Sequence, residues 1–199
     1  NWSVKKLLRA IVTSSTYRQS SFVSADDLEA DPRNIYLARM PRIRLSAEMI
    51  RDQALAVSGL LNRKMYGKSV MPYQPPGVWQ VIYDNRPWKT SADGDQYRRA
   101  LYTYWRRTSP YPSMITFDRP SGEFCVSRRI RTNTPLQALT TLNDPVYMEA
   151  ARALATQIFA MDDLSVEGKL SRAYRQVLCE EPSSQKVEAL EMLFENSLA

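Results

Sequence analysis

The feature that most constrains the fold of this chain is a pair of helix starts, each made of a capping residue followed by proline. The first is Thr134-Pro135-Leu136-Gln137, where the threonine and the glutamine three residues later form the pattern of a capping box. The second is Asp144-Pro145, ten residues further on. Because proline has no N–H to donate, a helix can begin at each proline but cannot run through it undisturbed. The sequence therefore predicts a short helix at 135–142 and a longer one from 145 to about 161.

Apolar residues spaced for one helical face predict further helices. The clearest spans 47–61, since Ser46 can cap its N-terminus and Glu48 lies in the first turn, where the helix dipole favours a carboxylate. The same spacing predicts helices at 96–108, 166–179 and about 184–196, whereas the acidic segment 26–32 is predicted to be a loop. An N-terminal helix at 4–13 has an apolar stripe formed by Val4, Leu7, Leu8, Ile11 and Val12.

A stretch rich in proline and aromatic residues, about 66–94, interrupts the helical pattern. Its prolines and glycines disfavour regular structure, and Trp79 and Trp88 favour an ordered loop packed on the protein body over a plain linker. At most one short strand or hairpin is expected, and 79–83 is the best segment for it. The predicted fold class is therefore mainly α, an irregular helical domain with one long ordered loop. We expect a single domain over 1–199, in which 162–199 forms a helical-hairpin appendage.

The chain contains no histidine, which excludes much catalytic and metal chemistry. A Ser-His-Asp or Cys-His site, a zinc site built on histidine and axial histidine ligation of haem all need a side chain that is lacking here. The two cysteines, Cys125 and Cys179, could form one disulfide or remain thiols. No apolar run approaches the ~20 residues of a membrane span. We expect no metal, no cofactor and no membrane span in this chain.

Charge is distributed unevenly along the chain. The net charge is +6, but residues 98–131 contain eight arginines and two carboxylates, whereas residues 132–199 contain five basic and ten acidic residues. One interpretation is a basic face for an anionic partner. The other is that the acidic C-terminal helices pack beside the basic segment and neutralise it. Nucleic acid is not the expected partner, because no nucleic-acid recognition motif accompanies the charge.

The main candidate site is an arginine-rich block. Guanidinium groups match carboxylate, sulfate and phosphate oxygens two at a time, so a sulfated or uronic polysaccharide is a suitable ligand. The alternative is structural, with the same groups tying the segment to backbone carbonyls and to Asp118, Glu123 and Asp144. The candidate anion-binding residues are Arg106, Arg107, Arg128, Arg129 and Arg131.

Weaker candidates for chemistry lie in and near the same block. Asp118 and Glu123 are the residue types of a glycosidase pair, although the neighbouring arginines would hold both ionised. Cys125 is a candidate thiolate beside those arginines, and the alternative is an inert buried cysteine. Trp79 and Trp88 are candidates for an aromatic platform that stacks on sugars.

Four segments in order along the chain carry a resemblance to a known family. They are 2–5 with 13–21, then 42–52 with 56–59, then 97–103, and finally 117–118, Cys125, 128–129, Thr132-Asn133-Thr134-Pro135-Leu136-Gln137-Ala138-Leu139 and 142–145. Together they resemble the planctomycete-type C-terminal domain catalogued as domain-of-unknown-function family 1553. The resemblance extends from Trp2 to about Pro182. One departure is Leu8, at a position where many relatives are expected to have histidine.

This resemblance implies an exported bacterial setting. Such domains usually close large exported proteins and often follow a planctomycete-type cytochrome c domain, and relatives usually begin earlier than this chain. Residues 1–199 are thus expected to be the C-terminal part of a larger extracytoplasmic protein, periplasmic or secreted, with sibling domains as partners and a cytochrome c-like domain among them.

Two functions follow as expectations. The favoured one is a non-catalytic helical module that docks to sibling domains and binds anionic polysaccharide through the arginine-rich block. The alternative is a catalytic domain acting on sulfated or uronic polysaccharide, with carboxylate or tyrosine acid–base residues beside an arginine clamp.

Overall fold

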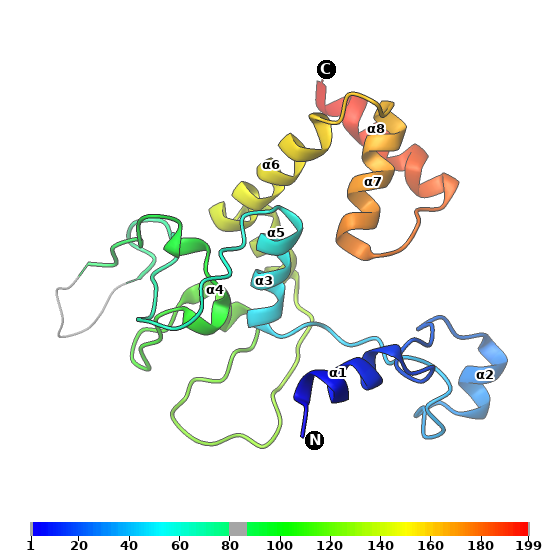
Figure 1. Ribbon diagram of the computed structural model, residues 1–199, viewed down its shortest axis with the longest axis horizontal. Coiled ribbons are helices and arrows are strands. Elements are labelled where there is room, and N and C mark those ends of the chain that lie inside the picture. The colour runs from blue at the N-terminus through cyan, green and yellow to red at the C-terminus, as the bar shows by residue number, and fades with distance from the viewer. Residues whose placement is uncertain (1, 80–86, 199) are drawn as a thin grey trace. The chain divides into compact units, whose positions relative to one another are not determined.

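The computed structural model of the chain describes residues 2–79 and 87–198 (Figure 1). Over these residues it contains eight α-helices and two short 3₁₀ turns, with no strand or sheet. The prediction of a mainly α fold is confirmed. The segment favoured for a strand falls outside the described residues from position 80 to position 83.

The chain divides into two compact units, residues 1–44 and 45–199, which we call the N-terminal unit and the C-terminal unit. The prediction of one domain over the whole chain stays a prediction.

The N-terminal unit contains α1 (Val4–Thr13) and α2 (Ala25–Ala30). The α1 prediction is confirmed, whereas the prediction of a loop at 26–32 is wrong. The side chain of Ser24 accepts a hydrogen bond from the Asp27 amide and starts α2, and acidic residues in its first turn suit the helix dipole. Among the described residues of this unit, no large apolar side chain is buried.

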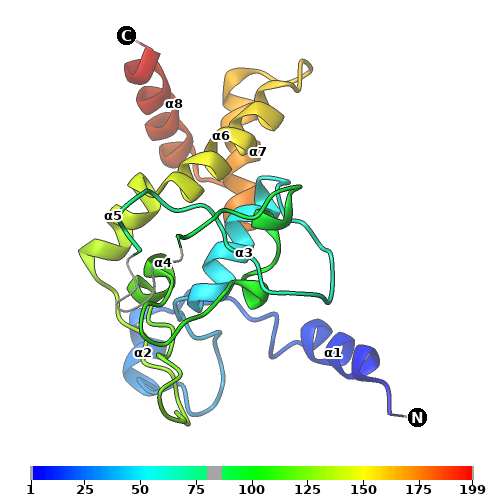
Figure 2. The same ribbon diagram turned by 90° about the vertical axis from the view of Figure 1, so that its left-hand side faces the viewer.

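The C-terminal unit contains the other six α-helices. They are α3 (Ala47–Val57), α4 (Pro112–Thr116), α5 (Pro135–Asn143), α6 (Pro145–Phe159), α7 (Val166–Leu178) and α8 (Ser184–Leu198). Both cap-then-proline starts begin helices where the sequence predicts them. Helix α3 contacts α4 and α6 and lies centrally among them (Figure 2). The core cluster is formed by Ala47, Ala100, Tyr111, Met114, Phe117 and Tyr147.

Helices α7 and α8 pack against each other, and two glutamines tie α7 to α3. Gln53 Nε2 donates to the Val177 carbonyl at 3.1 Å, and Gln176 Nε2 donates to the Val57 carbonyl at 2.5 Å. Gln53 is the polar interruption in the apolar stripe of α3, and this contact explains it. That 162–199 forms a helical-hairpin appendage stays a prediction.

The predicted helix at 96–108 is absent, and the reason is the burial of Arg98. Only two 3₁₀ turns form there, Asp95–Tyr97 and Ala100–Tyr102. The Arg98 side chain is 1% exposed and its guanidinium donates to three carbonyls of the preceding loop, those of Lys64, Tyr66 and Lys68. Bridges at Asn62 and Val70 hold the same two segments side by side. A continuous helix would forgo these contacts.

Candidate functional site

Residues 119–131, which we call the arginine loop, connect α4 to α5 and extend away from the helices of the C-terminal unit in both views (Figures 1 and 2). The loop is closed at its base by Asp118 and Thr132. The Asp118 carboxylate accepts from the Thr132 amide at 2.7 Å and from the Thr132 hydroxyl at 2.9–3.0 Å. Asp118 has a φ of 61°, a conformation that aspartate tolerates better than most residues. The two ends of the loop are therefore joined by short hydrogen bonds.

Gln137 reinforces this closure from the first turn of α5. Its side chain is 3% exposed, and Nε2 donates to the Thr116 carbonyl at 2.9 Å and to the Thr132 hydroxyl at 3.0 Å. Its Oε1 accepts from the Thr134 amide at 3.2 Å, which completes the capping box predicted from the sequence. The same residue thus starts α5 and holds both ends of the loop.

Glu48, in the first turn of α3, is an ion-pair partner for two arginines of the loop. Its carboxylate lies 2.7 Å from Arg129 Nη1 and 3.4 Å from Arg119 Nε. Burial alone would raise the pKa of the Glu48 carboxyl, but the hydrogen bond from Arg129 and the charges of both arginines outweigh it and lower the pKa. The ion pairs of Arg119 and Arg129 therefore go to α3, and not to the acidic C-terminal helices.

Trp105 holds the first part of the loop. The Arg119 guanidinium lies 4.0 Å above the centre of its ring, a cation–π geometry, and the indole Nε1 donates to the Ser121 carbonyl at 2.9 Å. Arg119 and Glu48 were missed as site residues by sequence reasoning. The sequence signal for Glu48, an acidic residue in the first turn of a helix far from the block, is too common to mark it as a site residue.

The five predicted arginines have different surroundings. Arg129 is paired with Glu48, and Arg106 is half-buried. Arg128 and Arg131 are exposed on the loop. Arg107 is exposed and lies close to the loop. A Cβ atom added to Gly122 of the loop would lie 4.0 Å from Arg107 Cγ. The exposed cations that remain for a ligand are thus Arg107, Arg128 and Arg131.

The weaker candidates are placed differently. Asp118 is engaged by Thr132 at the loop base, whereas Glu123 and Cys125 are exposed on the loop. Cys125 and Cys179 are both free thiols and both exposed. The structure therefore has no disulfide between Cys125 and Cys179. Catalytic roles for Asp118, Glu123 and Cys125 stay predictions.

Trp79 and Trp88 lie together, with ring centres 5.1 Å apart in an edge-to-face arrangement. Each indole N–H is already engaged: Trp79 donates to the Ser109 carbonyl at 2.6 Å and Trp88 to the Pro72 carbonyl at 2.7 Å. Trp88 also packs against the core, 5.6 Å from the Tyr111 ring. These contacts are those of aromatics that anchor a loop on the body, as expected for the 66–94 region, and a sugar-stacking role for the pair stays a prediction.

Three tyrosines in the C-terminal unit have raised pKa values. Burial raises the pKa of the Tyr111 and Tyr147 phenols, and the hydrogen bond to Glu149 raises the pKa of Tyr97. A tyrosine that acts as a base needs a lowered pKa. These three side chains are therefore poorly suited to that role.

Neither a metal site nor a membrane span emerges from the described part of the chain. Over residues 2–79 and 87–198, no three His, Cys, Asp or Glu side chains are grouped to hold a metal ion. No helix within those ranges is long and apolar enough to cross a membrane. The expectation that the chain has no cofactor stays a prediction.

Comparison with known proteins assigns the family. The model of the PSD1 family, described as a protein of unknown function (DUF1553), matches residues 1–194. The chain therefore belongs to this family, as the four sequence segments predicted. Searches of curated proteins and of solved structures each found no match.

Replacing Glu48 with glutamine should lower the free energy of unfolding at neutral pH by about 1–2 kcal/mol, since one half-buried carboxylate serves two arginines. Because the folded pKa of Glu48 is lowered, its contribution is complete above the unfolded pKa and is lost as pH falls through the folded pKa. Denaturation in urea at neutral pH and at several acidic values should show the two proteins converging on acidification. A difference that is constant with pH would contradict the ion-pair assignment.

Proposed function

We propose that this chain is a non-catalytic helical module of an exported multidomain bacterial protein, and that its arginine loop binds an anionic polysaccharide while the module docks to sibling domains. The observation that carries the proposal is that only some of these arginines form ion pairs that hold the loop. Arg119 and Arg129 are used by Glu48 to hold the loop, whereas Arg107, Arg128 and Arg131 are exposed. A loop that served only to fasten α4 to α5 has no need of two further exposed arginines, Arg128 and Arg131, with Arg107 exposed beside them.

The closed base of the loop supports binding on energetic grounds. Ordering a flexible loop on association costs free energy, and a loop already joined at Asp118 and Thr132 avoids part of that cost. Exposed guanidinium groups can then form paired hydrogen bonds with sulfate or carboxylate oxygens. Repeated anionic groups along a polysaccharide would engage several arginines at once.

The catalytic alternative has less support. Asp118, one of its two carboxylates, is engaged by Thr132 and Gln137 in closing the loop. The tyrosines with shifted pKa values are shifted away from base chemistry. We therefore propose binding ahead of catalysis.

The proposal is tested by measuring the affinity of the full chain for heparin and for a polyuronate. Substituting Arg128→Gln together with Arg131→Gln should weaken binding roughly tenfold or more, because charge-assisted hydrogen bonds contribute about 1.5–3 kcal/mol each. Both side chains are exposed, so the fold should be retained.

A matched control is the pair Arg63→Gln and Lys68→Gln, which removes the same charge from another exposed part of the C-terminal unit. We expect it to bind nearly as the unsubstituted protein does. Equal losses in the two double variants would show that only net charge matters. That result, or the absence of binding to either glycan, would refute the proposed site.

A further inference from the structure

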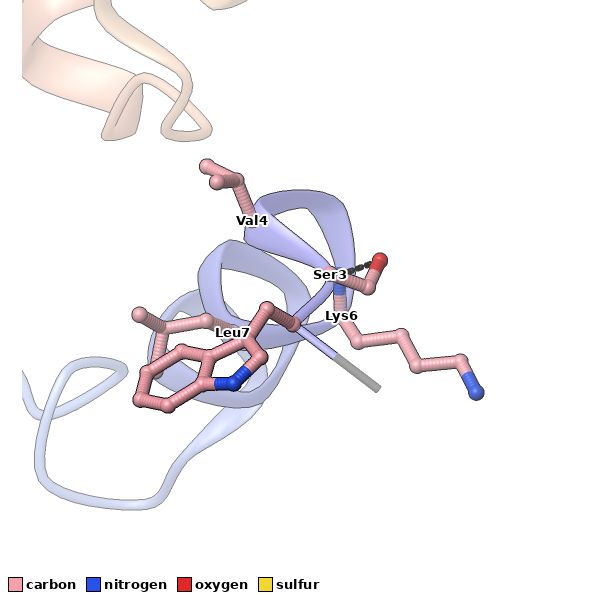
Figure 3. A pocket seen from close by; sticks show the side chains of 5 residues that line it. Ser3, Val4, Lys6 and Leu7 are labelled. Carbon is pink, nitrogen blue, oxygen red and sulfur yellow. Dashed lines mark hydrogen bonds between the residues drawn. The ribbon is translucent and has the colours of Figure 1, made fainter.

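Helix α1 in the N-terminal unit has one apolar face and one basic face. The stripe of Val4, Leu7, Leu8, Ile11 and Val12 is exposed along its whole length, with Val4 69% exposed. Lys6 and Arg9 lie on the other side of the helix, and Lys5 lies at the edge of the stripe beside Val12. Figure 3 shows the side chains of Lys6 and Leu7 pointing to opposite sides of α1. This is the division expected of a helix that lies at a boundary between water and an apolar phase.

No described part of the N-terminal unit buries the apolar face of α1. No large apolar side chain is buried among the described residues of that unit. Trp2, next to the helix start, is fully exposed and lines a hollow of about 530 Å³ together with Ser3, Val4, Lys6 and Leu7 (Figure 3). An apolar face of this kind on an ordered helix is typical of an interaction surface.

Charge identifies the kind of surface that fits it. Residues 1–24 contain four basic residues and no acidic residue. Three of the four are on α1 itself, Lys6 and Arg9 opposite the apolar stripe and Lys5 at its edge. Helices with this combination, cationic on one side and apolar on the other with a tryptophan at the end, bind in the headgroup region of anionic bilayers. A protein groove would require no such excess of positive charge.

We propose that α1 is an interfacial helix that lies on an anionic lipid surface, with its apolar stripe among the acyl chains and its lysines and arginine at the phosphate groups. The helix has ten residues, about 15 Å in length, so it lies on a membrane and does not span one. This binding would be independent of the arginine loop, which belongs to the C-terminal unit.

The test uses the full chain and two kinds of vesicle, phosphatidylcholine alone and phosphatidylcholine mixed with phosphatidylglycerol, with binding read by co-sedimentation. The mixed vesicles should bind the protein and the neutral vesicles should bind it weakly. Leu8→Glu should reduce binding to the mixed vesicles about fiftyfold, because it removes an apolar contact and adds a negative charge. Ala10→Glu is the matched control: it adds the same charge outside the apolar stripe and should cost only about fivefold.

Several outcomes would overturn the proposal. Absence of binding to the mixed vesicles would do so, as would equal losses for the Leu8 and Ala10 variants. A fall in thermal stability of Leu8→Glu without vesicles would show that protein already covers the stripe. Self-association that Leu8→Glu abolishes would assign the stripe to a second copy. The Arg128→Gln and Arg131→Gln variant should lose glycan binding but keep vesicle binding, so the failure of one proposal can be told from the failure of the other.

Discussion

Replacing Arg98 with methionine should lower the free energy of unfolding by roughly 3 kcal/mol. Its guanidinium donates to the carbonyls of Lys64, Tyr66 and Lys68, at 3.3, 2.5 and 3.2 Å. It also lies 3.8 Å from the centre of the Tyr102 ring. Methionine fills most of the volume but leaves the three carbonyls without this donor. Urea denaturation followed by tryptophan fluorescence would measure the loss.

Arg99→Met provides the matched control one residue away. Arg99 is about half exposed and forms an ion pair with Asp52 at 3.5 Å near the surface, so its loss should cost less than about 1 kcal/mol. Similar losses in the two variants would mean that Arg98 is not the organising group of this region.

Replacing Gln137 with leucine should lower the free energy of unfolding by about 2–3 kcal/mol and open the arginine loop. The change removes a donor to the Thr116 carbonyl and the Thr132 hydroxyl, and an acceptor for the Thr134 amide. Because the site is buried, water replaces these partners poorly. Denaturation gives the stability, and limited proteolysis within 119–131 reports the opening.

Thr141→Leu is the control for placing a leucine on the same helix, since Thr141 is exposed. It should leave both stability and protease resistance nearly unchanged. A Gln137→Leu variant whose loop resists protease as well as the unsubstituted chain would show that the loop is held by other contacts.

The helix starts at Pro135 and Pro145 are predictable because their determinants are local. A cap, a proline and a glutamine three residues on act within one turn of the chain. The 96–108 segment could not be predicted in the same way. Its apolar residues do have helical spacing. The burial of Arg98, however, depends on carbonyls 30 to 34 residues away, which no local pattern reveals. The prediction of a loop over the short helix α2 leaves out Ser24, whose side chain caps the helix.

In the candidate site too, local features can be predicted from the sequence and long-range contacts cannot. The exposure of Arg128 and Arg131 agrees with a loop dense in residues that are costly to bury. The partner of Arg129 is Glu48, 81 residues earlier, and a single sequence offers no means of pairing them. The sequence suggested Asp118, Glu123 and Asp144 as structural partners for the arginines, and the ion pairs of Arg119 and Arg129 instead use the first turn of α3.

The central claim is that the arginine loop is closed at its base and so presents its exposed arginines from a fixed frame. Amide hydrogen exchange at Thr132 tests it most directly, because this N–H donates to Asp118 at 2.7 Å while the neighbouring loop is exposed. We predict that the Thr132 amide is protected relative to that of Ser127, and that Gln137→Leu abolishes the difference. Equal exchange at Thr132 and Ser127 in the unsubstituted protein would contradict the claim.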